Sequence, residues 1–435
     1  MVDHCIVLSD RTAALTELCG ISVLERLLRT LRRCGVRHAT VLSSAPDLIA
    51  NHLDRPSWAR AELKTETRKQ SSEFVTVTDI VDVWPAEVET ALVVRANVVL
   101  DVRLARRIVS EVGNIALIDS AVPAEIAPLV FSAPNTNAGK LCGAALIKRE
   151  WLSTQTGRLE EALCDGLDHR TVAPLDVADQ PVYDGKLRRK LRPFWFVASS
   201  PQTIKLAEGI LLDSTQKGAL DIPAYLHAPI EKFLVAYLCW TSITPNQLTF
   251  LCNVVAWIAT ILFATGHLVS GIVIALIIGV LDGLDGKQAR LKVETTKRGK
   301  LEHWFDGVFE WSWWTALAYQ FQVSGQLPGA FRYWFLLVVA EAIDGVAKGA
   351  VLFTTGKLID ELNTFERIIR LVGGRRNVYV WVLAIGILFG APAKAFVAMI
   401  YLEAMTAAVH LPHATWTLYK ARSGSVGASW PNDLE

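Results

Sequence analysis

Long apolar stretches in the second half of the chain limit what it can fold into. After about residue 245 of the 435, six of them follow one another, at about 247–265, 267–284, 302–323, 331–353, 376–391 and 394–418. Each has close to the roughly twenty residues that a helix needs to cross a bilayer. The sequence therefore predicts an all-α polytopic membrane domain of six transmembrane helices.

Basic residues in the connections orient these helices. The segments 286–300 and 354–376 are rich in lysine and arginine, whereas the turns near 266, 326 and 392 hold few. Basic loops stay on the cytoplasmic side of a membrane, so both segments and both termini are predicted to face the cytoplasm. This predicts a multi-pass protein of the inner (cytoplasmic) cell membrane. The net charge of +1 gives no field that would favour nucleic acid as a partner.

The first half of the chain alternates short apolar strands with helical patterns. Strands are predicted at 4–9 and 38–43, and the segment 22–36 has apolar residues at helical spacing, with Gly35 as a stop signal. The segment 101–113 is predicted as a helix, and further strands are FVTVTDIV (74–81), TALVVRANVVL (90–100) and NIALIDS (114–120). This alternation predicts a Rossmann-type layered α/β domain with a largely parallel sheet.

Four segments are expected along the chain. Residues 1–185 form the α/β domain, and 186–240 form a linker with an amphipathic juxtamembrane helix. The membrane domain follows at 241–422, with a tail at 423–435. A basic cluster, KLRRKLR (186–192), is either a solvated loop or a contact with anionic headgroups.

Acidic residues gather where the membrane helices should meet the cytoplasm. They form two groups, one closing the second apolar stretch and one opening the third: Asp282, Asp285, Glu302, Asp306 and Glu310. Carboxylates that face inward from two adjacent helices can enclose hard divalent cations. The alternative is that they only form salt bridges with the loop lysines. Glu310 is either a spare ligand or faces a neighbouring helix.

Small and basic residues accompany the first pair of acids. A helix over 279–290 would carry one set of residues on a single face: Asp282, Asp285, Gly286, Ala289 and Arg290. The two small residues leave a notch where a flat base could approach the helix, and the arginine offers charge to a phosphate. With a divalent metal and cytoplasmic access, these features indicate phosphoryl transfer from a nucleotide.

The stretch DGLDGKQAR (282–290) resembles the signature of the CDP-alcohol phosphotransferase family, D-x-x-D-G-x-x-A-R followed by G-x-x-x-D-x-x-x-D. The residues that match in place are Asp282, Asp285, Gly286, Ala289, Arg290 and Gly299. ITPNQLT (243–249) is similar to the family's entry into its first membrane helix, and the resemblance covers about residues 217–420. Strict spacing would put His303 and Gly307 at the third and fourth acidic positions. We prefer the register one residue back, which gives Glu302 and Asp306.

The resemblance implies an enzyme that moves a substituted phosphate from a CDP-linked donor to an alcohol acceptor and releases CMP, in phospholipid or polyol-phosphodiester biosynthesis. It implies two divalent ions, Mg2+ or Mn2+, held by Asp282, Asp285, Glu302 and Asp306. It also makes Asp306 the general base toward the acceptor hydroxyl. The family suggests a homodimer in the lipid bilayer.

Other residues receive roles from the same resemblance. The nucleotide-binding set is Gly286, Ala289, Arg290, Asn246 and Thr249, and the alternative for the last two is capping of the first membrane helix. Arg375 and Arg376 resemble a basic element that meets a phosphorylated acceptor. The alternative for these two arginines is a positive-inside anchor.

The segment SVLERLLRTLRRCGVRHATVL (22–42) resembles sugar-phosphate nucleotidyltransferases. Archaeal bifunctional inositol-phosphate cytidylyltransferase/di-myo-inositol phosphate phosphate synthases join such a domain to the same membrane domain. Their glycine-rich GxGxR loop is absent here, since the first strand runs into SDRTAALTEL (9–18), and VVRANVVLD (93–101) replaces their Gly-Asp metal site. We predict a domain that has lost catalysis and serves in regulation, scaffolding or dimer contact.

Two other functions stay open. One is a bifunctional enzyme whose first domain also makes the CDP-alcohol from CTP. The other is a cation-coupled transporter, which is disfavoured because its acids should spread across the depth of the membrane, whereas these cluster at one face.

Overall fold

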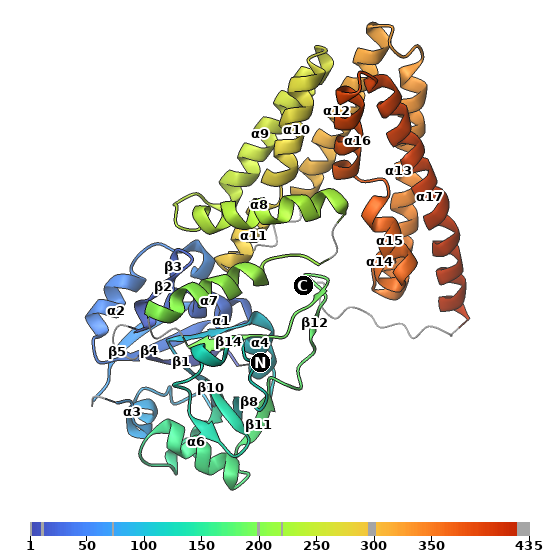
Figure 1. The fold of residues 1–435 in the computed structure, drawn as a ribbon. Coiled ribbons are helices and arrows are strands. Elements are labelled where there is room, and N and C mark those ends of the chain that lie inside the picture. Colours follow the sequence, from blue (N-terminus) through green and yellow to red (C-terminus); the bar gives the residue numbers. More distant parts are fainter. Residues whose placement is uncertain are drawn as a thin grey trace. The chain divides into compact units, whose positions relative to one another are not determined.

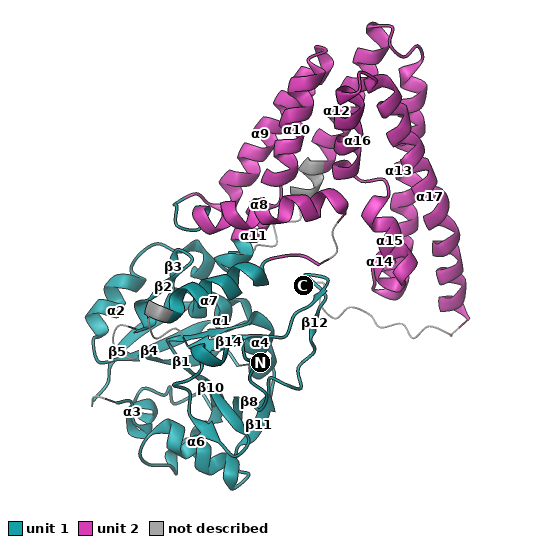
Figure 2. Cartoon of the chain, in the orientation of Figure 1, with its two compact units in different colours: residues 1–215, 238–242, 289–294 teal, residues 216–237, 243–288, 295–435 magenta. Residues whose placement is uncertain are grey.

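The computed structural model of the protein describes residues 2–9, 13–71, 74–197, 201–218, 221–294 and 302–423, with only the backbone described at 201–202 and 302–306. The chain divides into two compact units (Figure 2). The α/β unit comprises residues 1–215, 238–242 and 289–294, and the helical unit comprises 216–237, 243–288 and 295–435. Two short segments that adjoin membrane helices in the sequence therefore belong to the α/β unit.

A mixed sheet forms the centre of the α/β unit (Figure 1). Its order is β11 (Ala173–Asp176), β8 (Ile115–Asp119), β10 (Gly139–Lys148), β6 (Thr90–Arg95), β1 (His4–Ser9), β4 (His38–Ser43) and β5 (Lys64–Lys69), with β9 (Asn135–Thr136) paired to β10. Neighbours are parallel except for β10, which runs antiparallel to β6 and β8. This confirms the predicted layered α/β domain and largely parallel sheet.

Helices also belong to this unit, and all except the last one connect strands. They are α1 (Val23–Arg33), α2 (Pro46–Leu53), α3 (Val77–Asp82), α4 (Val102–Val109), α5 (Arg149–Ser153), α6 (Leu159–Asp168) and α7 (Pro201–Ser214). The α1 helix begins at the Ser22 cap, whose hydroxyl accepts a hydrogen bond from the Glu25 amide at 3.1 Å. It ends before Gly35, which has a φ of 98° that favours glycine.

Two strand predictions in this unit are wrong. The segment 74–81 contains α3 instead of a strand, because Thr76 and Asp79 form a capping box that starts a helix there. The segment 90–100 is two strands, since the chain turns at Ala96 and Asn97, and β7 (Val98–Leu100) pairs with β14 (Trp195–Val197) outside the main sheet. The edge strand β5 escaped prediction because its sequence, KTETRK, is charged and largely exposed.

The helical unit contains ten helices in its described part (Figure 1). They are α8 (Ile222–Leu238), α9 (Pro245–Ala264), α10 (Leu268–Leu281), α11 (Leu284–Leu291), α12 (Glu302–Val323), α13 (Ala330–Thr355), α14 (Ile359–Leu362), α15 (Thr364–Val372), α16 (Arg376–Leu388) and α17 (Pro392–Arg422), of which α8 and α11 end in the α/β unit. Large aromatic side chains fill the core, among them Phe263, Trp313, Trp314 and Phe396.

Three stretches of the described part are long and apolar enough to cross a membrane: α9, Leu268–Leu291 and α17. The helices α15 and α16, bent by 43°, make a fourth if they form one span. The α13 helix has the length, but it contains Arg332, Glu341, Asp344 and Lys348. The helical unit is thus a membrane-embedded part, and the count of six transmembrane helices stays a prediction.

Candidate active site

The first two acids of the signature lie at a break between two helices. The α10 helix ends at Leu281, and α11 begins only at Leu284. The prediction of one uninterrupted helix over 279–290 is therefore wrong at Asp282 and Gly283. Gly283 is needed there, because a Cβ at this position would lie 2.6 Å from the carboxyl carbon of Glu231.

Asp285 is buried, with 4% of its surface exposed. The Thr249 hydroxyl of α9 donates a hydrogen bond to its Oδ2 at 2.6 Å, and the Gly286 amide donates to Oδ1 at 2.5 Å. Such hydrogen bonds satisfy and orient a carboxylate away from bulk water. The structure thus brings together two residues that the sequence had placed in the site, Thr249 and Asp285.

Thr244 and Gln247 cap the N-terminus of the first membrane helix, not Asn246 and Thr249. Thr244 accepts a hydrogen bond from the Gln247 amide at 3.3 Å, and Gln247 accepts one from the Thr244 amide at 2.9 Å. This capping box excludes the capping role for Asn246 and Thr249. Asn246 lies exposed on the first turn of α9.

Asp282 forms an ion pair with Arg376, at the start of α16. The guanidinium carbon of Arg376 lies 5.1 Å from the centre of the Phe309 ring, a distance typical of a cation–π contact. Arg376 and Asp282 are also electrostatic neighbours of Glu310. Arg376 is therefore a part of the acidic site.

Arg375 has a different partner from its neighbour. Its Nε lies 3.3 Å from Oδ2 of Asp221, a buried residue whose Oδ1 accepts a hydrogen bond from the Ala224 amide in the first turn of α8. The two arginines of GGRRN thus contact two aspartates from different helices. The sequence pattern did not predict this division, since both aspartates are distant from residue 375 in the chain.

The lysine of the signature is paired with a residue that sequence reasoning missed. Lys287 Nζ lies 2.8 Å from Oε2 of Glu231 in α8 and 2.5 Å from Oε1 of Gln216. Glu231 is buried together with His227, four residues earlier, and this shared face of an amphipathic helix was the available signal. In the described contacts Lys287 pairs with Glu231, and Asp282 pairs with Arg376. The alternative of salt bridges between the acids and the loop lysines stays untested, because Lys297 and Lys300 lie outside the described residues.

The other positions that the sequence predicts to bind the nucleotide lie on α11. Gly286 and Ala289 are half-buried, and Arg290 Nε donates a hydrogen bond to the Thr215 carbonyl oxygen at 3.0 Å. Thr215 and Arg290 both belong to the α/β unit.

The third and fourth acids cannot be placed in the site. The α12 helix begins at Glu302, and the side chains of Glu302 and Asp306 lie outside the described residues. Within the part that is described, no group of three or more His, Cys, Asp or Glu residues could hold a metal ion. The choice of Glu302 and Asp306 over His303 and Gly307 stays a prediction.

A family model matches most of the helical unit. Residues 242–416 match the family model described as CDP-alcohol phosphatidyltransferase. The chain is 29% identical over 208 residues to a bifunctional IPC transferase and DIPP synthase of Rubrobacter xylanophilus, covering 47% of this chain and 45% of the relative. It is 27% identical over 213 residues to the protein of that name from Aquifex aeolicus, covering 47% of each. The chain thus spans about half the length of the curated relatives that it matches.

Solved structures resemble the chain over a similar share. The inositol-1-phosphate CTP transferase from T. maritima covers 48% of this chain and 96% of its own, at 12% identity and a TM-score of 0.36. HddC from Yersinia pseudotuberculosis covers 48% and 99%, at 13% identity and a TM-score of 0.34. The sequence signature and the helices that carry it lie within residues 242–416, the part of the chain that matches the CDP-alcohol phosphatidyltransferase family model.

Proposed function

We propose that this protein is an integral-membrane CDP-alcohol phosphotransferase. It transfers a substituted phosphate from a CDP-linked donor to an alcohol acceptor and releases CMP. The observation that carries this proposal is a pair of contacts inside the region that matches the family. Thr249 of α9 binds Asp285 of α11, and Arg376 of α16 binds Asp282 in the α10–α11 turn.

The chemistry of this site suits a divalent cation. Asp282 and Asp285 offer carboxylate oxygens, the ligands that Mg2+ and Mn2+ prefer. In the structure the Arg376 guanidinium is the charge partner of Asp282, so a metal ion bound there would displace it or share the carboxylate with it. We propose Asp282, Asp285, Glu302 and Asp306 as the ligands of two such ions, which would neutralise the donor diphosphate and stabilise the leaving CMP.

The chain's own residues have separate tasks in this proposal. Asp306 accepts the proton of the acceptor hydroxyl as general base. Arg375 and Arg376 bind a phosphate of the acceptor, because a guanidinium can form two parallel hydrogen bonds with it. Thr249 holds the Asp285 carboxylate in one orientation.

The donor site lies along α11 in the same proposal. Gly286 and Ala289 leave space for the cytidine beside the helix, Arg290 contacts a phosphate, and Asn246 reaches the nucleotide from the first turn of α9. We place the site at the cytoplasmic face of the inner membrane, in a homodimer with six transmembrane helices per chain.

A bifunctional enzyme is the second candidate, because the two curated relatives carry that description. The acids around VVRANVVLD speak against it. Asp101 caps α4 through the Arg103 amide and pairs with the Arg103 guanidinium at 2.7 Å, and buried Asp119 pairs with Arg192 at 2.7 Å. These carboxylates already serve the fold, and VVRANVVLD (93–101) stands in place of the Gly-Asp metal site.

A screen of CDP-linked alcohols tests both candidates. The purified full chain is incubated with each donor, an alcohol acceptor and Mg2+ or Mn2+, and CMP release is measured. The proposal expects CMP release with at least one donor, and none after chelation of the metal. Pyrophosphate release from CTP and an alcohol phosphate would establish the bifunctional enzyme. A chain that releases no CMP from any donor, yet moves cations across vesicles, would contradict the transferase.

A further inference from the structure

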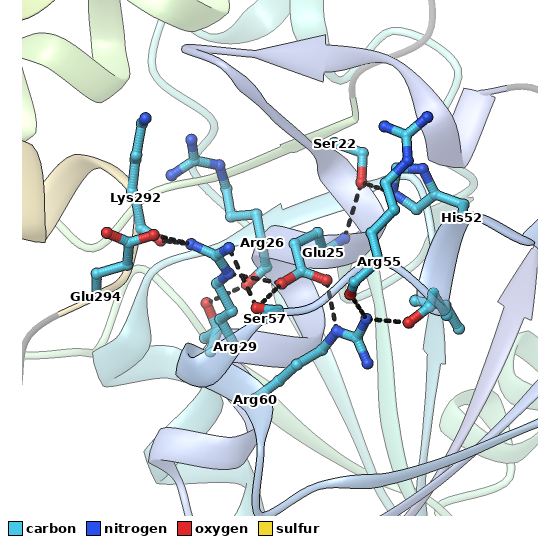
Figure 3. Close-up of polar contacts among 12 residues, drawn as sticks. Ser22, Glu25, Arg26, Arg29, His52, Arg55, Ser57, Arg60, Lys292 and Glu294 are labelled. Carbon is cyan, nitrogen blue, oxygen red and sulfur yellow. Dashed lines mark hydrogen bonds and ion pairs between the residues drawn. The ribbon is translucent and has the colours of Figure 1, made fainter. Parts of the chain in front are cut away.

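A network of charged side chains lies buried in the α/β unit around Glu25 of α1 (Figure 3). Glu25 Oε1 accepts hydrogen bonds from Arg29 Nε at 2.7 Å and from the Ser57 hydroxyl at 2.5 Å, and Oε2 accepts one from Arg60 Nε at 2.7 Å. The side chains of Glu25, Arg29 and Arg60 are each 9–10% exposed. Burial of such charges is costly unless they are paired, so this network needs a structural or functional reason.

Arg29 reaches beyond the network, to a segment 265 residues away in the chain. Its Nη1 donates to the Lys292 carbonyl oxygen at 2.8 Å and to Glu294 Oε1 at 2.7 Å. Figure 3 shows its guanidinium between Glu25 and Glu294. Both carboxylates are thus bound by one arginine.

Arg26 also lies on α1, and it binds the carbonyl of Leu291, the residue before Lys292. Its Nη1 donates to the Leu291 carbonyl oxygen at 2.5 Å, and its Nη2 donates to the Leu18 carbonyl oxygen at 3.0 Å. Leu291 is the last residue of α11. The final carbonyls of a helix have no partner within it and carry the negative end of its dipole. Arg26 therefore caps the helix that carries the signature, and Arg29 binds the carbonyl of the residue that follows it.

Further contacts fix the same segment. Lys292 Nζ donates to the Thr241 carbonyl oxygen at 3.1 Å, and Leu291 and Val293 are buried. Val293 has a φ of 55°, in the left-handed region that a β-branched residue rarely adopts. Strain of this kind persists where the surroundings impose it, and it concentrates at functional sites.

We propose that Arg26 and Arg29 of the α/β domain are positioning residues for the transferase reaction. They hold residues 289–294, which include the end of α11. This segment lies between Asp285 and Glu302 in the chain, so holding it restricts where both acids can lie. Only seven residues, 295–301, separate Glu294 from Glu302. This inference rests on the proposed function, and it gives a domain without its own catalytic motifs a task in the neighbouring chemistry.

A double-mutant cycle tests this task, with Arg29→Ala, Glu294→Ala and the double variant in the full chain. Glu294→Ala removes the carboxylate that Arg29 binds in residues 289–294 but leaves the Glu25 network intact. A loss of activity in this variant is therefore not explained by misfolding of the α/β domain. The matched control is Arg32→Ala on the same helix, which removes only a pair with the exposed Glu62. CMP release gives kcat and KM for the donor, and hydrogen exchange reports the order of residues 289–294.

Each single variant should lower kcat about 10- to 100-fold, because small displacements of catalytic groups have effects of this size. KM for the donor should change less, the double variant should be no worse than Arg29→Ala, and Arg32→Ala should match the wild type. The positioning role would be overturned if the losses in kcat of the two single variants added up in the double variant. It would also be overturned if a variant kept the wild-type kcat although hydrogen exchange at residues 289–294 had become fast. A wild-type chain that releases no CMP would instead refute the proposed function, while hydrogen exchange would still report the clamp.

Discussion

The hydrogen bond from Thr249 to Asp285 offers a sharp test of the site, through Thr249→Val. Valine keeps the shape of threonine but cannot donate to the carboxylate oxygen 2.6 Å away. A hydrogen bond to a charged group contributes about 1.5–3 kcal/mol, and Asp285 is too buried for water to replace it freely. We expect kcat/KM to fall about 10- to 150-fold, with a higher metal concentration needed for half-maximal activity.

The same helix supplies a matched control. Thr260 also lies on α9, and its hydroxyl contacts the neutral Ser312 hydroxyl at 2.7 Å. Thr260→Val should leave the metal dependence unchanged, and Thr249→Ser should restore most of the activity lost in Thr249→Val. Wild-type kcat/KM and metal dependence in Thr249→Val would refute the view that Asp285 must be held for catalysis.

Two further predictions concern the α/β unit. Burial raises the pKa of Glu25, but the Ser57 hydrogen bond and the charge of Arg29 outweigh this and hold the pKa below its ordinary value of 4.5. The stabilising contribution of the Glu25 carboxylate is therefore present above pH 4.5 and lost as the pH falls through the lowered pKa. In Glu25→Gln the free energy of unfolding should depend less on pH in this range. The same pH dependence in Glu25→Gln and the wild type would contradict this reasoning. Gly20→Ala should lower the thermal stability of the unit, because Gly20 has a φ of 77° and an added Cβ would lie 1.9 Å from the Cys239 carbonyl oxygen; an unchanged melting temperature would contradict the close approach.

Local sequence patterns predicted much of the fold. The strands at 4–9 and 38–43 and the helix at 302–323 have the bounds expected of them, because alternating or continuous apolar runs end at clear polar signals. The segment 74–81 misled because a capping box outweighed the strand propensity of its valines. Short-range polar contacts therefore determined whether a segment formed a helix or a strand where its apolar pattern was compatible with both.

The site depended more on contacts between distant residues. Gly283 lies close to the carboxyl group of Glu231 in another helix, and Arg29 pairs with Glu294, 265 residues away in the chain. Neither contact produces a periodic pattern from which it could be predicted in a single sequence. The signature DGLDGKQAR predicts the acids and their chemistry from the sequence, because its residues lie close together in the chain, and this stays a prediction.

The most direct test of the central claim is CMP release by the Asp282→Asn variant, compared with the wild type and with Asp360→Asn. Asp360 pairs with Arg370 at 3.5 Å, so its replacement also removes an aspartate–arginine contact from the helical unit, away from the signature. The account predicts that Asp282→Asn is folded and inserted in the membrane but releases no CMP, while Asp360→Asn stays active. CMP release by Asp282→Asn at the wild-type rate would contradict it.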